Sequence, residues 1–189
     1  MRIIGGTFRG LKLAEVGAGD AAAHLRPTTD RVRESIFNLL VNGRIAQTGD
    51  PVTGARVLDL FAGTGALGLE ALSRGAARVA FVDDGTAARA LLRRNIELMR
   101  AMGQTDIWRR DATRMGPNRG AGYTLVFLDP PYGKGLGEQA LASCVAGGWL
   151  APGAVVVWEE SAAPLPPIGF EQIDQRAYGD TVITLLRAV

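Results

Sequence analysis

Short runs of apolar residues alternate along the chain with stretches in which apolar residues recur at helical spacing. Continuous apolar runs of this length are typical of parallel strands buried on both faces. We therefore predict five strands, at residues 57–60, 78–82, 105–110, 125–128 and 154–158. Helical periodicity predicts four helices, at residues 30–42, 66–74, 88–102 and 138–146. Strands that alternate with helices indicate an α/β fold with a parallel sheet.

Both ends of the chain carry turn signals that predict hairpins. Near the C-terminus, two candidate strands flank Tyr178 to Thr181, whose central Gly-Asp pair suits a two-residue turn. This hairpin would add an antiparallel strand to an otherwise parallel sheet. At the N-terminus, Met1 to Leu13 contains two short apolar runs around paired glycines, which predicts a small hairpin outside the main core.

The N-terminal hairpin segment is basic, because Arg2, Arg9 and Lys12 are its only charged residues up to Leu13. Two interpretations stay open. The three cations can grip a phosphate backbone, or they can simply protect an exposed strand edge from aggregation. We expect residues 1–25 to form this hairpin and a following loop, and residues 26–189 to form the main domain.

The composition narrows the possible chemistry. A chain of 189 residues with 47% hydrophobic and 21% charged residues is typical of one globular domain. A single cysteine, Cys144, and a single histidine, His24, argue against a disulfide, a cysteine zinc site and a catalytic triad, and we expect no metal. No apolar run reaches membrane-spanning length, so we expect a cytoplasmic protein. The pI near 9.0 permits an anionic partner.

The stretch from Leu125 to Tyr132 ends an apolar run with an acid, two prolines and an aromatic residue. Pro130 and Pro131 stop strand pairing and hold the backbone rigid, because each ring fixes φ and lacks an N–H donor. They fix Asp129 at the carboxyl end of a strand, where open α/β sheets bind their ligands. A plain turn with Asp129 as a cap is the alternative interpretation.

A carboxylate, a rigid carbonyl and an aromatic face together suit a flat heterocycle that bears an exocyclic amino group. Asp129 and the carbonyl of Pro130 can accept the two N–H groups of such an amine, which directs the nitrogen lone pair toward an electrophile. Tyr132 can stack on the ring, a contact worth about 1–3 kcal/mol. We expect Asp129 to orient the amine rather than to act as a strong base, because an unperturbed aspartate has a pKa of about 3.9.

A second motif runs from Asp59 to Glu70 and contains Gly63, Gly65 and Gly68. Glycines let the backbone approach a ligand closely. Their spacing satisfies the dinucleotide fingerprint and so permits NAD, whereas a phosphate-binding P-loop would need a Gly-Lys-Ser/Thr sequence that is missing here. Asp59 favours S-adenosylmethionine, because a carboxylate attracts the ammonium group of an amino acid and repels a pyrophosphate.

Three further polar residues are candidates for cofactor contacts. Asp83 follows the second predicted strand, where an acid commonly binds ribose hydroxyls, with Asp84 nearer solvent. Asp111 follows the third and could accept a hydrogen bond from the amino group of an adenine. An ordinary strand-end acid is the alternative interpretation of Asp111. Asn95 is polar on an apolar helix face, so it either tethers a cofactor loop or is a satisfied core residue.

With these residues placed, the chain resembles the S-adenosylmethionine-dependent methyltransferases of the Rossmann-like class, and among them the RsmD family of small-subunit ribosomal RNA guanine-N2 methyltransferases. The segments that resemble the signatures of that family are Arg2–Gly6, Arg26–Thr28, Arg31–Glu34, Asp59–Glu70, Asp129–Tyr132 and Tyr178–Thr181. The Asp-Pro-Pro-Tyr motif alone occurs in enzymes that methylate amino groups of DNA, RNA and protein glutamine. The Arg-Pro-Thr segment and the basic N-terminal hairpin narrow the match. One departure is Asp83, where relatives often carry glutamate.

The resemblance implies an α/β fold with a Rossmann-like, seven-stranded, mostly parallel sheet, an antiparallel last strand and helices on both faces. It implies contacts with S-adenosylmethionine from Asp59, Phe61, Gly63, Thr64, Gly65, Asp83, Asp111 and Ala112. It implies catalysis by Asp129, Pro130, Pro131 and Tyr132. The candidate RNA-binding residues are Arg2, Arg9, Lys12, Arg26, Arg31 and Lys134.

The activity that the resemblance implies is methylation of the N2 amino group of a guanine in 16S ribosomal RNA, free or in the assembling small subunit, by a monomeric enzyme. Three alternatives stay open. A DNA adenine-N6 methyltransferase would use the same four-residue motif. A non-catalytic assembly factor would bind ribosomal RNA and keep a vestigial pocket. An NAD-dependent redox enzyme would satisfy the glycine spacing.

Overall fold

The computed structural model describes residues 1–15 and 28–189. The remaining segment contains two of the residues considered above, His24 and Arg26. The RNA contact proposed for Arg26 and the expected domain boundary after residue 25 therefore lie outside the described residues.

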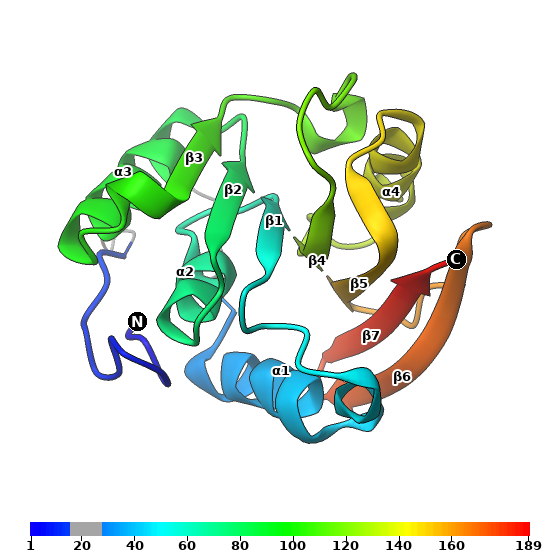
Figure 1. Cartoon of the computed structure of the whole chain (residues 1–189), viewed down its shortest axis with the longest axis horizontal. Coiled ribbons are helices and arrows are strands. Elements are labelled where there is room, and N and C mark those ends of the chain that lie inside the picture. Colours follow the sequence, from blue (N-terminus) through cyan, green and yellow to red (C-terminus); the bar gives the residue numbers. More distant parts are fainter. Residues whose placement is uncertain (16–27) are drawn as a thin grey trace.

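Seven strands form one sheet in the order β3-β2-β1-β4-β5-β7-β6 (Figure 1). Neighbouring strands from β3 to β5 are parallel, whereas β7 runs antiparallel to both β5 and β6. The expected sheet with an antiparallel last strand is confirmed. The strands are β1 (Arg56–Leu60), β2 (Arg78–Val82), β3 (Thr105–Trp108), β4 (Tyr123–Leu128), β5 (Leu150–Glu160), β6 (Phe170–Tyr178) and β7 (Thr181–Ala188).

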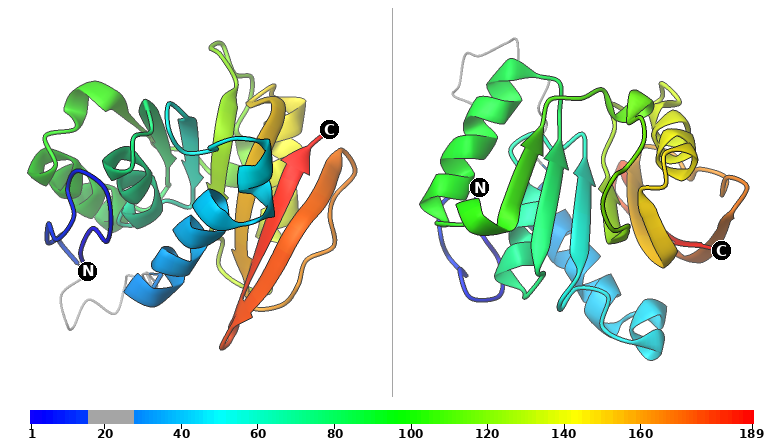
Figure 2. Two further views of the ribbon diagram at one scale, coloured as in Figure 1. Left: turned by 60° about the horizontal axis from the view of Figure 1, so that its bottom comes forward. Right: turned by 45° about the horizontal axis from the view of Figure 1, so that its top comes forward.

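Helices cover both faces of the sheet (Figure 2). They are α1 (Asp30–Asn42), α2 (Ala66–Ser73), α3 (Thr86–Leu98) and α4 (Leu136–Ala146), with the short 3-10 helices η1 (Arg44–Thr48), η2 (Met102–Gln104) and η3 (Ala112–Arg114). Helices α1, α2 and α3 contribute to one hydrophobic cluster, and α4 contributes to the other. Over the described parts of the chain, none of the helices combines the length and the apolar character needed to cross a bilayer.

The two clusters explain the continuous apolar runs in the sequence. Successive side chains of a strand point to opposite faces, so a strand covered on both sides must be apolar at every position. In β4, Leu125 and Phe127 join the cluster under α1 and α2, while Val126 and Leu128 join the cluster under α4. Cys144 also packs in the second cluster, where burial raises the pKa of its thiol to about 12. Cys144 is thus a core-packing residue.

The ends of the elements follow local signals in the sequence. The Thr29 hydroxyl accepts a hydrogen bond from the Val32 amide at 3.3 Å and so caps α1, which ends at Gly43 as predicted. Gly179 adopts a positive φ of 61° in the turn between β6 and β7, which confirms the C-terminal hairpin. The third strand is shorter than predicted, because its pairing with β2 ends at Trp108.

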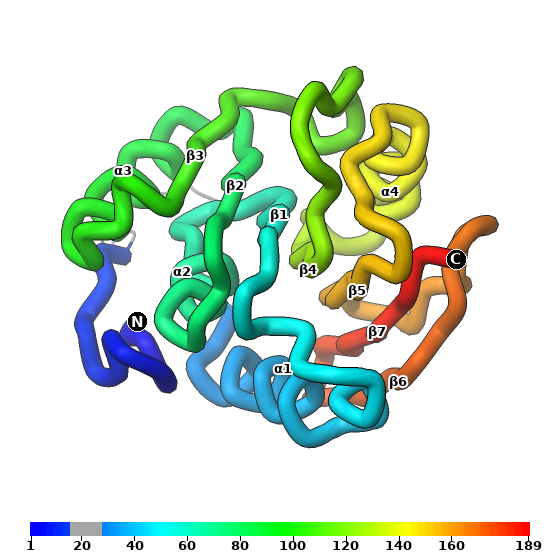
Figure 3. The backbone as a smooth tube through the Cα atoms, viewed as in Figure 1, coloured from blue at the N-terminus to red at the C-terminus, as the bar shows by residue number. Residues whose placement is uncertain are grey.

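The N-terminal segment turns back on itself as a short hairpin, in which the Ile3 amide donates a hydrogen bond to the Leu11 carbonyl at 2.9 Å. A single antiparallel bridge joins Arg2 and Lys12. Ile3 is fully buried and Leu13 is 6% exposed, and both belong to the main hydrophobic cluster. The expectation that this segment lies outside the core is therefore wrong, because its apolar residues pack inward while its basic residues face solvent. Figure 3 shows the segment beside α2.

Glu70 of α2 anchors the N-terminal segment. Its carboxylate is fully buried and accepts hydrogen bonds from the backbone amides of Ile4 and Gly5, both at 2.8 Å. Arg74, one turn along the same helix, pairs with Glu70 at 2.8 Å and compensates its charge. Ser73 adds a hydrogen bond from its hydroxyl to the carbonyl of Gly5 at 2.6 Å. A buried carboxylate thus fixes the segment to α2, while backbone hydrogen bonds join its own two arms.

We predict that Glu70→Ala loosens the N-terminal segment and lowers the free energy of unfolding by about 2–4 kcal/mol, because each backbone amide that loses its acceptor costs about 1–3 kcal/mol. Urea denaturation measures the loss, and hydrogen exchange at residues 3–5 localises it. Glu97→Ala, on the exposed side of α3, is the matched control and should change stability little. Equal stability of the two variants would contradict the anchoring role.

Candidate active site

The candidate site lies at the carboxyl ends of β1, β2, β4 and β5. The strand order reverses between β1 and β4, which makes this edge a topological switch point where open α/β sheets bind ligands. The register pairs Leu60 of β1 with Leu128 of β4, and Leu128 with Trp158 of β5. Asp129 therefore emerges between the ends of two neighbouring strands.

The Asp-Pro-Pro-Tyr segment forms the first part of the site. Asp129 is half-buried, Pro130 is buried, and Tyr132 is 36% exposed, so the tyrosine ring has one accessible side. The Tyr132 hydroxyl donates a hydrogen bond to Glu159 Oε1 at 2.8 Å. Among the described residues, no donor reaches the Pro130 carbonyl. This oxygen can therefore accept a hydrogen bond from a ligand.

Asp129 lies close to a second carboxyl group, that of Glu159. Glu159, near the end of β5, is only 5% exposed. The hydroxyl of Thr28 lies 3.2 Å from Asp129 Oδ2 and 3.2 Å from Glu159 Oε2, so it bridges the two carboxyl groups. Glu159 therefore contacts Tyr132 through one oxygen and Thr28 through the other.

The electrostatics of Asp129 differ from the prediction. Burial, and then the neighbouring Glu159, raise the pKa of Asp129 well above its ordinary value. Burial also raises the pKa of Glu159. The expected ordinary pKa of Asp129 is therefore wrong, because the sequence did not reveal a second carboxyl group beside it. Burial raises the pKa of Tyr132 too, which keeps its hydroxyl protonated as a donor.

Glu160 holds the loop that follows Tyr132. Its Oε1 accepts a hydrogen bond from the Gly133 amide at 3.2 Å and another from the Ser161 amide at 2.8 Å. Lys134, a candidate RNA-binding residue, is exposed on the same loop. The loop is thus tied down at its base and presents its lysine to solvent.

The glycine turn after β1 forms the second part of the site. Phe61 has a φ of 58°, a left-handed conformation that is costly for an aromatic residue and is typical of functional sites. Gly63 and Gly65 follow with φ of 55° and 78°. A Cβ atom on Gly65 would lie 2.3 Å from Leu92 Cδ1, so the close approach of α3 also requires glycine there. The positive φ angles of Gly63 and Gly65, and the close approach of Leu92 to Gly65, explain why glycine occupies these two positions.

Asp59 lies under this turn. Its Oδ2 accepts a hydrogen bond from the Gly68 amide at 2.9 Å, and the residue is only 2% exposed. Burial raises the pKa of Asp59 to about 8, against the lowering effect of the Gly68 hydrogen bond. Asp83 also contributes to the increase through its charge. The two acids predicted for cofactor binding therefore lie within electrostatic reach of each other.

Asp83 is bound to the glycine turn. Its Oδ2 accepts from the Gly63 amide at 2.9 Å, and its Oδ1 accepts from the Gly85 amide at 2.8 Å. Burial raises its pKa in spite of these two hydrogen bonds. Each carboxylate oxygen retains a second lone pair, so a ribose hydroxyl can still be accepted. Asp84 is exposed, as expected.

Asn95 tethers the glycine turn, as one of its two interpretations predicted. The fully buried side chain donates to the Thr64 carbonyl at 3.0 Å and to the Ala14 carbonyl at 3.2 Å, and accepts from the Ala14 amide at 2.6 Å. The Thr64 hydroxyl faces Met1 Sδ at 3.8 Å. Thr64 therefore contributes its backbone to the turn, while its side chain points to the N-terminal segment.

Asp111 and Ala112 occupy the edge of the site beyond β3. Asp111 caps η3 by accepting from the Thr113 amide at 2.9 Å and from the Thr113 hydroxyl at 2.6 Å. These hydrogen bonds lower its pKa, so it is ionised and exposed. Ala112 is buried in the cluster under α4. Asp111 is accessible to a ligand, whereas only the backbone of Ala112 is available.

The chemistry of these groups fits S-adenosylmethionine better than a dinucleotide. Asp59 and Asp83 bring two carboxyl groups to the glycine turn, and the charge of Asp59 contributes to the raised pKa of Asp129 nearby. A carboxyl group is complementary to the ammonium group of an amino acid and to ribose hydroxyls, whereas a pyrophosphate would be repelled. Oδ1 of Asp59 has no donor among the described residues, which leaves it for an ammonium group.

The described RNA-binding candidates lie on the N-terminal segment, at the start of α1 and, for Lys134, on the loop after Tyr132. Arg2, Arg9 and Lys12 are exposed on the N-terminal segment, and Arg2 also lies 3.6 Å from Asp30 of α1. Arg31 is exposed at the start of α1, which adjoins the Thr28 bridge at the site. The structure thus leaves these cations accessible to a polyanion.

Sequence reasoning missed Glu159 and Glu160, and it recognised Thr28 only as part of a helix start and a family signature. A signal for the two glutamates was present, because they follow the apolar run 154–158 just as Asp129 follows 125–128. Parallel neighbours that both end in acids bring those acids to one edge.

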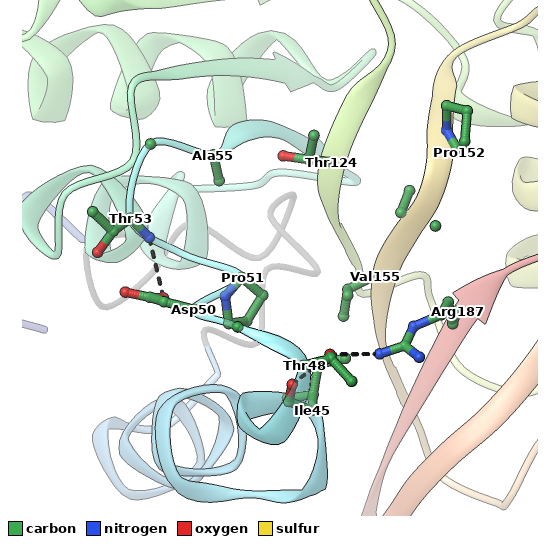
Figure 4. A pocket seen from close by; sticks show the side chains of 14 residues that line it. Ile45, Thr48, Asp50, Pro51, Thr53, Ala55, Thr124, Pro152, Val155 and Arg187 are labelled. Atoms are coloured by element: carbon green, nitrogen blue, oxygen red, sulfur yellow. Dashed lines mark hydrogen bonds between the residues drawn. The ribbon is translucent and has the colours of Figure 1, made fainter.

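A hollow of about 440 Å³ lies at the opposite end of the sheet (Figure 4). It is bordered by the amino ends of β1, β4 and β5, with Arg187 bound to Thr48 at 2.8 Å on one side. None of the predicted site residues lines it. The candidate site is therefore the edge with the acidic cluster.

Comparison with known proteins shows the family of the chain. The model of the family described as Conserved hypothetical protein 95 matches residues 1–187. Ribosomal RNA small subunit methyltransferase D of Escherichia coli K12 is 36% identical over 188 residues, which cover 98% of this chain and 88% of that protein. The Haemophilus influenzae protein of the same name is 34% identical and matches 87% of this chain and 81% of its own length.

A solved structure shows the same fold over the whole chain. It is described as "Putative methyltransferase yhhF from Escherichia coli", has a TM-score of 0.81 and 34% identity, and covers 100% of this chain and 97% of its own. Because the family model and these relatives span almost the entire sequence, the chain belongs to the RsmD family of ribosomal RNA small subunit methyltransferases.

Proposed function

We propose that the protein transfers a methyl group from S-adenosylmethionine to the exocyclic N2 amino group of a guanine in small-subunit ribosomal RNA. The observation that carries the proposal is the Asp129 to Tyr132 segment, which presents a carboxyl group, an unoccupied backbone carbonyl and one accessible aromatic face at the switch point of the sheet. The relatives named for methylation of small-subunit ribosomal RNA support the substrate class.

The cofactor would supply an electrophilic methyl group on a sulfonium. Asp59 and Asp83 would hold its ammonium and ribose groups beside the glycine turn. Asp129 and the Pro130 carbonyl would accept the two N–H groups of the guanine amine, and Tyr132 would stack on the ring. Transfer of this methyl group would form an N–C bond and would leave the electron pair of the broken S–C bond on sulfur. The proton then leaves nitrogen for Asp129, which its raised pKa suits for acceptance.

An unpaired guanine is the favoured substrate. The site lies at the edge of a sheet and must receive a base out of its stack, which costs a few kcal/mol and least for a loop base. The exposed cations Arg2, Arg9, Lys12, Arg31 and Lys134 would neutralise phosphates around it.

We predict that Asp129→Ala lowers kcat by about 100-fold or more, because the amine loses the acceptor that orients it. The test uses labelled S-adenosylmethionine with unmethylated small ribosomal subunits, free ribosomal RNA and DNA, followed by identification of the methylated nucleoside. N2-methylguanosine from RNA, lost in the variant, supports the proposal. Methyladenine from DNA would instead support the alternative amino-methyltransferase, and full activity of a variant that binds cofactor normally would exclude the role of Asp129.

We predict that Asp59→Asn weakens S-adenosylmethionine binding by about tenfold or more, because the variant lacks a carboxyl group that can ionise when the ligand's ammonium group binds beside it. The same change should stabilise the free protein. Asp59 ionises at 3.8 when unfolded but near 8 when folded. Wild-type stability should therefore fall relative to the variant as pH rises between these values, by about 1.4 kcal/mol per pH unit.

Calorimetric titration and urea denaturation at several pH values measure the two effects of Asp59→Asn. Asp84→Asn, an exposed neighbour at the same edge, is the matched control and should change neither. A pH-independent stability difference between wild type and Asp59→Asn would show that Asp59 is ionised throughout.

We predict that replacing Arg2, Arg9 and Lys12 by alanine reduces the salt dependence of RNA binding by about two to three units of log K against log salt, because each phosphate contact contributes about 0.7–0.9. Fluorescence anisotropy at a series of salt concentrations measures this slope. A control with alanine at the exposed residues Arg44, Arg93 and Arg94 removes the same charge elsewhere. Identical slopes for the two triple variants would leave the segment with only a structural role.

A further inference from the structure

The carboxyl groups of Asp129 and Glu159 meet at one hydroxyl group. Thr28 Oγ1 lies 3.2 Å from Asp129 Oδ2 and 3.2 Å from Glu159 Oε2. A threonine hydroxyl has one proton to donate and two lone pairs that accept. It can therefore donate to only one of these carboxyl groups. The other contact is a hydrogen bond only if that carboxyl group carries a proton of its own.

The contact of the second Glu159 oxygen with Tyr132 fixes which groups donate and which accept in the hydrogen bonds among Glu159, Thr28 and Asp129. The Tyr132 hydroxyl donates to Glu159 Oε1 at 2.8 Å, so a proton on Glu159 belongs on Oε2, which faces Thr28. Glu159 then donates to Thr28, and Thr28 donates to Asp129. All three contacts become hydrogen bonds, and Oδ1 of Asp129, which has no donor among the described residues, is left for a substrate.

The surroundings of the pair oppose two negative charges. Glu159 is 5% exposed, and burial raises the pKa of both carboxyl groups. The titratable groups that face them are Asp59 from β1, Glu160 from β5 and Tyr132 from the loop after β4, and the two acids raise the pKa of Asp129 further. Two carboxyl groups in such contact share a proton and titrate as a unit.

We propose that Glu159 is a positioning residue that takes the proton shared with Asp129 when a substrate amine binds, so that Asp129 meets the amine as an anion. This inference rests on the proposed function. The amine donates to Asp129 and stabilises its ionised form. Asp129 gives its proton to Thr28 Oγ1 as Thr28 gives its own to Glu159 Oε2, so no proton is gained or lost overall.

Neutral Glu159 then holds both catalytic side chains in one orientation. It keeps the Thr28 hydroxyl directed at Asp129 and accepts the hydroxyl of Tyr132, whose ring would stack on the base. At alkaline pH the shared proton is lost, and Thr28 faces two anions with one proton to donate. The orientation of Asp129 is then lost, so the rate of methyl transfer falls toward alkaline pH.

Substitution of Glu159 tests this role. Glu159→Ala removes the partner of Thr28 and Tyr132, and we expect a loss of about 100-fold in kcat. Glu159→Gln can donate its amide N–H to Thr28 and accept from Tyr132 but cannot ionise. We expect it to recover most of that loss and to lack the alkaline fall seen in wild type. Glu171→Ala, exposed at the start of β6, is the matched control.

Two outcomes would overturn the proposal. One is a Glu159→Gln enzyme as slow as Glu159→Ala, which would mean that Glu159 acts as an anion. The other is a Glu159→Gln enzyme with the same alkaline fall as wild type, which would place the titrating group elsewhere.

A second measurement needs no activity. In protein with ¹³C-labelled carboxyl groups, NMR titration should show the Asp129 and Glu159 signals changing together, in a step that Glu159→Gln removes. Full ionisation of both groups at neutral pH would refute the shared proton. Failure of the proposed function appears differently, as absence of N2-methylguanosine from the wild-type reaction while the paired titration is still observed.

Discussion

Burial of the sheet on both faces is the constraint on which the rest of the structure depends. Because the side chains of the central strands fill both hydrophobic clusters, most of the polar groups near these strands lie at their ends. Parallel strands direct their carboxyl ends to a single edge, and the strand order places β1 beside β4 there. Asp59 and Asp129, far apart in the sequence, thereby come within electrostatic reach of each other.

The same constraint explains how much the sequence could predict. The apolar runs in the sequence predicted the buried strands, and the acids that follow three of them, Asp83, Asp111 and Asp129, were predicted as site residues from the sequence. The N-terminal segment was harder, because its exposed cations alternate with residues such as Ile3 and Leu13 that pack into the core. What holds it is the buried carboxylate of Glu70, a contact across more than sixty residues that no local pattern reveals.

Glu159 and Thr28 show what cannot be predicted when the residues at the end of each strand are considered separately. Their relation to Asp129 depends on the register between β4 and β5 and on the entry to α1. The pKa of Asp129 was misjudged for the same reason, since its increase comes from burial and from a neighbour on another strand. Residue types indicate which groups can do chemistry, whereas protonation is a property of the assembled site.

The candidate site at the carboxyl ends of the strands contains several features that lower the stability of the fold. Asp59 and Asp129 are carboxyl groups in positions that raise their pKa, and Phe61 adopts a left-handed backbone conformation. A neutral side chain in place of Asp59 or Asp129 would remove the free-energy cost of burying a carboxyl group. A glycine in place of Phe61 would remove the backbone strain. Selection for stability alone would therefore replace all three residues. The two hydrophobic clusters offset this loss of stability, because they lie between the sheet and its helices and do not depend on the residues of the candidate site. Residues that lower the stability of an otherwise consistent fold are expected where a protein binds a ligand.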